Sequence, residues 1–161
     1  MNPLPSVSDY RRGGELGDPA AFRAALHPDV VLRSPLSDRI RFAGRDQVLE
    51  VIEAALGTFE GLSYHTEIGD DRTRVLLSSG RVDGVPFDET TVLRLADDGR
   101  IAEIALSIRP LPAAAAVLRA LGARLMTSRG KPIAGRAVRV GLGPLVGLVR
   151  LADRMSASAA G

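Results

Sequence analysis

The chain has 161 residues, of which 45% are hydrophobic and 25% charged, the proportions of one ordinary globular domain. It contains no cysteine, so disulfides, thiol nucleophiles and cysteine-ligated metal centres are excluded. Its two histidines, His27 and His65, are too few for a histidine-rich metal site, and we expect neither a metal nor a cofactor. The formal net charge of +2 is unevenly divided. Residues 119–154 hold eight basic residues and one acidic residue, which leaves a net charge of −5 on residues 1–118.

Helices are predicted first from capping residues and from the spacing of apolar side chains. A short helix is expected over 7–15, and a second over 18–26, where Asp18 can cap and Pro19 loses no hydrogen bond in the first turn. The helix predicted with most support spans 46–59, because its apolar residues recur at intervals of three and four. Another is expected after Pro112 and runs to about residue 126.

Strands are predicted where the apolar pattern changes to a period of two. A short strand is expected at 30–32, followed by a loop with extended character at 36–45. The stretch 62–68 alternates, and two Asp-Gly pairs, Asp83-Gly84 and Asp98-Gly99, then mark two tight hairpins. The last part of the domain is therefore a four-stranded antiparallel meander.

The two hairpins also predict which residues lie opposite each other. If each loop has two residues, partners across the first turn have numbers that sum to 167, and partners across the second sum to 197. This register places Asp88 opposite Arg109 and Arg94 opposite Glu103, two pairs of opposite charge. The register also assigns each residue to one of the two faces of the sheet. We expect the helices to cover the more apolar face, which contains Arg74, Leu76, Ser78, Glu89, Thr91, Leu93, Ile104, Leu106 and Ile108.

Three stretches in this order resemble the nuclear-transport-factor-2-like superfamily, in its polyketide-cyclase-like (SnoaL-type) branch. They are LHPDVVLRSP at 26–35, FAGRDQVLEVI at 42–52 and VLRLADDGRIAEIALSIRPL at 92–111. The resemblance implies an α+β fold in which a curved, mostly antiparallel sheet wraps around N-terminal helices to form a cone. It also implies an apolar pocket for a hydrophobic small molecule and a homodimer formed through the open face of the sheet.

The same resemblance allows a comparison with epoxide hydrolases of this superfamily, which use an arginine and two aspartates on adjacent strands. The arginine corresponds to Arg74, but the aspartate positions correspond to Leu76 and Leu106. Leucine cannot activate water, so the chain departs from that pattern. We therefore interpret the protein first as a small-molecule-binding domain without a confirmed catalytic constellation, and lean against an enzyme.

An isomerase, cyclase or hydrolase acting on a hydrophobic substrate is the alternative, with Glu89 as the general base. Glu89 falls on the apolar face, where burial raises a carboxyl pKa, although an exposed or arginine-paired Glu89 is the competing interpretation. Tyr10 lies in a segment that covers the pocket mouth in relatives, where it closes over a ligand or only fastens its helix. The other candidate ligand-binding residues are Tyr64, His65, Arg74, Leu76, Ser78, Thr91 and Leu106.

Residues 1–126 are expected to form the cone-shaped domain, and 127–161 a basic Gly/Arg-rich extension with a short helix at 144–155. This extension docks on the acidic domain, contacts an anionic membrane through 127–155, or binds nucleic acid. It has no aromatic residue on which bases can stack, so nucleic acid is the least favoured partner. A third hypothesis is thus a dimeric interaction protein with a partner-binding tail. The N-terminus has no apolar signal segment, so we expect a cytoplasmic protein. If the extension contacts an anionic membrane, we expect the protein to be peripheral at that membrane.

Overall fold

The structure is a computed structural model that describes residues 4–35 and 40–128, and residues 130, 140, 144, 147–149, 151 and 152. The elements of the main part follow in the order α1 (Pro5–Leu16), α2 (Pro19–Ala25), β1 (Leu26–Arg33), β2 (Arg41–Ala43), α3 (Arg45–Leu56), β3 (Phe59–Gly69), β4 (Thr73–Val82), β5 (Val85–Leu95), β6 (Ile101–Arg109) and α4 (Leu111–Ser128).

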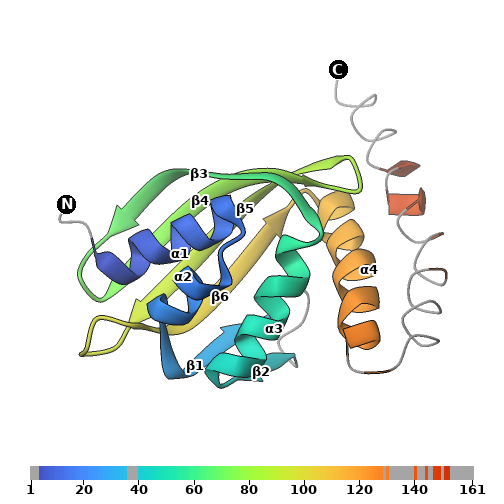
Figure 1. Ribbon diagram of the computed structural model, residues 1–161. Helices are drawn as coiled ribbons and strands as arrows, with labels where there is room; N and C mark the ends of the chain where they lie inside the picture. The colour runs from blue at the N-terminus through green and yellow to red at the C-terminus, as the bar shows by residue number, and fades with distance from the viewer. Residues whose placement is uncertain are drawn as a thin grey trace.

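The six strands form one curved sheet that is not closed into a barrel, in the order β2-β1-β6-β5-β4-β3. Strands β1 and β6 run parallel, and the other neighbouring strands run antiparallel. Helices α1, α2 and α3 lie against the concave side of the sheet, and α4 lies beside α3 at one end (Figure 1). The predicted α+β cone with a mostly antiparallel sheet is confirmed.

The predicted register of the two hairpins is confirmed from Thr73 to Arg109, apart from a shift at the second turn. Glu89 on β5 lies opposite Ser78 on β4 and Ile108 on β6. The predicted salt bridge between Arg109 Nε and Asp88 Oδ2 is present at 3.1 Å, at the exposed surface. The predicted sorting of the faces follows from this register.

The N-terminal helices pack together because of small residues and one cap. The Asp18 carboxylate accepts hydrogen bonds from the backbone N–H groups of Ala20 at 2.9 Å and Ala21 at 3.3 Å. A Cβ on Gly13 would lie 2.6 Å from the Phe22 ring, so glycine inside α1 allows α2 to approach closely. The prediction that the second helix runs to residue 26 was wrong by one residue, because β1 already begins at Leu26 to pair with Ile101.

The predicted loop at 36–45 contains a short strand, β2, that the sequence analysis did not recognise. Three residues are too few to show a period of two, and β2 forms only because β1 offers it an edge. The parallel pairing of β1 with β6 was also not predicted. It brings Arg33 Nε to 2.9 Å from Glu103 Oε1, whereas the predicted partner Arg94 lies at 4.0 Å.

Two hydrophobic clusters fill the domain. The larger lies between the sheet and helices α1, α2 and α3, and contains the fully buried Val7, Leu26, Leu76 and Ile104. The smaller lies beneath α4, where Ala113, Ala116 and Val117 pack against Val82 and Phe87. This second cluster fixes the N-terminal half of α4 over the end of the sheet.

Of the predicted helix at 144–155, the structure describes residues 144, 147–149, 151 and 152, all of them helical; the remainder, like most of the basic extension, lies outside the described residues. The division at residue 126 therefore stays a prediction, as does each proposed role of the extension. Across the described part of the chain, no helix combines the length and the apolar character that a membrane span requires.

Candidate functional site

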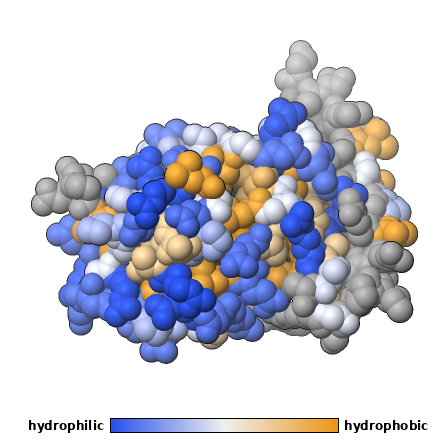
Figure 2. Space-filling model, in the orientation of Figure 1, coloured by the Kyte–Doolittle hydropathy of each residue, from blue (hydrophilic) through white to orange (hydrophobic). Residues whose placement is uncertain are grey.

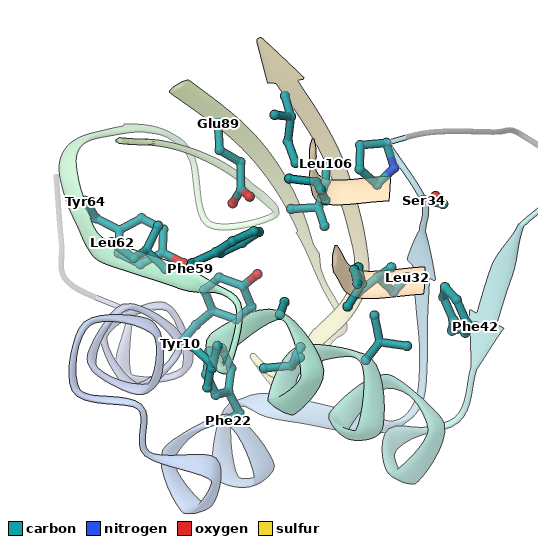
Figure 3. A pocket seen from close by; sticks show the side chains of 18 residues that line it. Tyr10, Phe22, Leu32, Ser34, Phe42, Phe59, Leu62, Tyr64, Glu89 and Leu106 are labelled. Carbon is teal, nitrogen blue, oxygen red and sulfur yellow. The ribbon is translucent and has the colours of Figure 1, made fainter. Parts of the chain in front are cut away.

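A pocket lies between the two hydrophobic clusters, where the sheet, the N-terminal helices and α4 do not meet completely (Figure 3). It encloses about 80 Å³. Its wall consists of eighteen residues, nearly all apolar: Tyr10, Phe22, Leu32, Ser34, Pro35, Phe42, Val51, Ile52, Ala55, Leu56, Phe59, Leu62, Tyr64, Glu89, Leu106, Ile108, Val117 and Leu121.

Glu89 is the one charged residue among these, and it points its carboxyl group into the pocket (Figure 3). The β5 register turns it toward the concave side of the sheet, where only 6% of the residue remains exposed. Its Oε1 accepts a hydrogen bond of 2.8 Å from the Thr91 hydroxyl, two residues further along the same face. Loss of solvent raises the pKa of Glu89 above its ordinary value, because burial disfavours the charged carboxylate, and the Thr91 bond offsets this only in part.

Two tyrosines bring their hydroxyl groups to the same pocket. Tyr10 comes from α1 and Tyr64 from β3, with ring centroids 6.3 Å apart in an edge-to-face arrangement. Burial, and then the neighbouring tyrosine and Glu89, raise the pKa of Tyr10. Burial, and then the charges of Glu89 and Glu15, raise that of Tyr64. Both tyrosines are therefore neutral hydrogen-bonding groups at physiological pH.

Of the candidate residues predicted from sequence, the structure brings Tyr64, Glu89 and Leu106 to the pocket wall, together with Tyr10. Two others, Ser78 and Thr91, are fully buried on the same face of the sheet without reaching the wall. Ser78 occupies the sheet position between Tyr64 and Glu89, and its hydroxyl has no hydrogen-bond partner among the described residues.

The other three candidate residues lie away from the pocket. Leu76 is fully buried in the main core. Arg74 is buried too, and its guanidinium pairs with Glu67 at 3.3 Å and with an Asp71 carboxylate at 3.5 Å. His65 is exposed on the opposite side of β3 from Tyr64 and contacts the neighbouring Thr66 hydroxyl. The alternation of β3 therefore settles which of the two residues at 64 and 65 faces inward.

Several wall residues were not predicted as site residues. Val117 and Leu121 come from α4, and Phe59 and Leu62 from the first residues of β3. The spacing of Val117 and Leu121 is one helical turn, a pattern that indicates a packed helix face but not what it packs against. Only the placement of α4 over the end of the sheet makes them part of a pocket.

The wall has an accessible side. Leu56, Phe59 and Leu62 are half-buried, and apolar residues reach the surface in the middle of the face shown in Figure 2, among hydrophilic residues. None of the described residues that line the pocket is Arg, Lys or His. The polar side chains of the wall are those of Tyr10, Tyr64, Ser34 and Glu89, and the rest of the wall is apolar.

An open, curved sheet around three helices, with an apolar pocket that contains one buried carboxyl, defines a cone-shaped pocket domain. The sequence profile of the SnoaL-like domain matches residues 7–104, more than half of the chain. The protein therefore belongs to the SnoaL-like family, within the nuclear-transport-factor-2-like superfamily. No curated protein matches the chain at a significant level.

Solved structures with the same fold include three informative relatives. A steroid delta-isomerase from Pseudomonas aeruginosa is 28% identical with a TM-score of 0.71, over 78% of this chain and 92% of that one. An uncharacterised protein with a cystatin-like fold from Silicibacter pomeroyi is 23% identical with a TM-score of 0.75, over 78% and 89%. A polyketide cyclase-like protein from Sinorhizobium meliloti is 23% identical with a TM-score of 0.54, over 63% and 93%. The fold is thus shared with isomerases and cyclases.

Proposed function

We propose that this protein binds a small, neutral and mainly hydrophobic molecule that carries a carbonyl or hydroxyl oxygen. The observation that carries the proposal is Glu89, a carboxyl group buried at the wall of an apolar pocket beside two neutral tyrosine hydroxyls. The Thr91 hydroxyl already bonds to one carboxyl oxygen of Glu89. A ligand hydroxyl can donate a hydrogen bond to this carboxyl, and a ligand carbonyl can accept one from a tyrosine hydroxyl, so the polar groups of the wall suit an oxygen-bearing molecule.

Charge and size limit the ligand further. An anionic ligand would meet the Glu89 carboxyl and find no cationic side chain among the described wall residues. The enclosed volume of about 80 Å³ is smaller than the roughly 150 Å³ of an apolar cavity that admits benzene. A six-membered ring compound therefore requires half-buried wall residues such as Leu56 and Leu121 to move slightly outward.

Matched ligands of the same shape test the proposal. Cyclohexanone is neutral, and cyclohexanecarboxylate carries a charge on a similar ring. The chain contains two tyrosines and no tryptophan, and both tyrosines line the pocket, so tyrosine fluorescence reports directly on occupancy. We expect saturable binding of cyclohexanone and at least tenfold weaker binding of the carboxylate. Equal affinity for both, or no saturable binding of the neutral ring, would refute the proposal.

Proton transfer on the bound carbonyl compound is the second candidate function, and the raised pKa of Glu89 favours it. The Glu89 carboxylate would remove a proton from the carbon next to the carbonyl, and the resulting enolate oxygen would accept hydrogen bonds from the tyrosine hydroxyls. Where the bound ketone carries a β,γ double bond, return of the proton to the γ-carbon of the dienolate completes an isomerisation without any other reactant. Leu76 and Leu106 stand where epoxide hydrolases have acids, so epoxide hydrolysis is not part of this proposal.

Deuterium exchange distinguishes catalysis from binding alone. We expect the protein to accelerate exchange of the α-hydrogens of cyclohexanone in heavy water, as followed by proton NMR. Glu89→Gln should abolish the acceleration and leave binding largely intact, whereas Glu60→Gln, at an exposed position on β3, should change neither. Exchange that persists in Glu89→Gln would exclude Glu89 as the base. If the wild type does not accelerate exchange, the proton-transfer function is refuted and only the binding function remains.

A further inference from the structure

Tyr64 lies on β3, which is the outer strand of the sheet, so one edge of its backbone faces no neighbouring strand. Helix α1 lies along that edge (Figure 1). The carboxylate Oε1 of Glu15 accepts a 2.9 Å hydrogen bond from the Tyr64 backbone N–H. The Nη2 of Arg11 donates a 3.3 Å hydrogen bond to the Tyr64 carbonyl oxygen. Both polar groups of this one residue are therefore held by α1.

The spacing of the two side chains suits this contact. Arg11 and Glu15 are four residues apart, so they project from the same side of the helix, one turn from each other. The Tyr64 ring passes beside Gly14, where a Cβ would lie 2.8 Å from its Cε2 and 2.9 Å from its hydroxyl oxygen. Glycine at this position lets the helix approach the ring, and the two flanking side chains then reach the backbone.

Arg11 and Glu15, which together hold the Tyr64 backbone, are called the clamp below. Further contacts attach this clamp to the sheet. Arg11 Nη1 lies 3.3 Å from Glu67 Oε2, and Glu67 Oε1 accepts a 3.3 Å bond from the buried Arg74. The pairing of β3 with β4 shifts by one residue between Tyr64 and Thr66, so the regular ladder is interrupted at the residue that the clamp holds. The sheet alone therefore constrains Tyr64 less than an uninterrupted strand would.

We propose that Arg11 and Glu15 are positioning residues, which set where the Tyr64 hydroxyl stands relative to Tyr10 and Glu89 in the pocket. The inference rests on the proposed function, since a ligand oxygen would meet that hydroxyl. The same helix supplies Tyr10, so one rigid element determines the relative placement of both hydroxyl groups. Without the clamp, the Tyr64 side chain loses its fixed distance from Tyr10.

Fluorine NMR of protein labelled with 3-fluorotyrosine provides a direct readout, because the chain contains only two tyrosines. Tyr10→Phe assigns the two signals. The variants are Glu15→Ala and Arg11→Ala, with Glu15→Gln as the conservative rescue because it keeps an acceptor oxygen. Arg12→Ala is the matched control on the same helix, since the salt bridge of Arg12 is with Asp9 on α1 itself. Each variant is also titrated with cyclohexanone.

We expect Glu15→Ala and Arg11→Ala to shift or broaden the Tyr64 signal and to weaken cyclohexanone binding about fivefold. Glu15→Gln and Arg12→Ala should stay within twofold of the wild type and leave the signal in place. If Glu15→Ala fails to fold, Arg11→Ala carries the same test through the Tyr64 carbonyl.

Two outcomes would overturn the inference. An unmoved Tyr64 signal in both alanine variants means that the clamp does not hold this side chain. A moved signal with unchanged affinity means that the position of Tyr64 does not matter to the ligand, so the contact is only structural. A wild type that binds no cyclohexanone counts against the proposed function instead, and the tyrosine signals then decide whether the clamp exists.

Discussion

Replacing Glu89 by Gln should change how the stability of this protein depends on pH. Glu89 is 6% exposed, and burial raises its pKa above the ordinary 4.5. Between the unfolded and the folded pKa, the native protein retains a proton that the unfolded chain has released. The free energy of unfolding of the wild type therefore falls as pH rises through this window, with a contribution of up to about 1.4 kcal/mol per pH unit.

Glutamine has the same shape and no proton to lose, so Glu89→Gln lacks this contribution. We expect the two proteins to differ least in stability below pH 4.5. The variant should then become progressively more stable than the wild type, up to the folded pKa of Glu89, above which the difference is constant. The pH at which the plateau begins is a direct measure of that pKa.

Urea unfolding of both proteins at half-unit steps from pH 4 to pH 8 measures the difference. Other carboxylates titrate in the same range, but they are common to both proteins and cancel in the subtraction. Glu60→Gln serves as the control, because this residue is exposed on the same sheet and should give a nearly flat difference. A flat difference for Glu89→Gln as well, or a variant that is less stable than the wild type at pH 8, would contradict the reasoning.

Three further predictions follow from the fold and the pocket. Because burial raises the pKa of both tyrosines, ultraviolet titration should show no tyrosinate near pH 10 until the protein unfolds. Ionisation of the native protein at pH 10 would contradict the burial of the tyrosines. Leu76→Ala should reduce the free energy of unfolding by about 3 kcal/mol in urea, because Leu76 is fully buried. Leu121 is half-buried at the pocket wall, so Leu121→Ala should cost less stability and, unlike Leu76→Ala, should improve binding of larger cyclic ketones. The predicted homodimer would use the outer face of the sheet, where Val92 is half-buried, so Val92→Arg should halve the mass measured by light scattering; a wild-type monomer would exclude the dimer.

The strand register could be predicted from sequence because it depends on local chemistry. Each Asp-Gly turn connects strands that are adjacent in the chain, and the charged pair Asp88–Arg109 supports only one alignment. The face of β5 that Glu89 occupies follows from that register, whereas its burial depends on the helices that cover this face. For a residue on the middle strand of three, counting residues from the two turns identifies its neighbours on both adjacent strands.

The pocket itself could be predicted only in outline. Tyr10, Tyr64 and Glu89 are separated by many residues, and they meet only because α1 lies along β3, where Gly14 permits close contact. The face of β3 on which Tyr64 lies could not be chosen from a strand with no hairpin register of its own. Nor could Val117 be assigned to the wall, since an apolar helix face does not identify its partner.

The sequence by itself thus determined the hairpin register and the face of β5 that carries Glu89, through interactions between residues close in the chain, and its resemblance to a known family indicated the class of fold. The tertiary structure decided the rest: the parallel pairing of β1 with β6, the strand β2, and the closure of the pocket by α1 and α4. These features depend on contacts between distant segments. Many arrangements of such segments have similar local preferences, and only the packing of the whole chain distinguishes them.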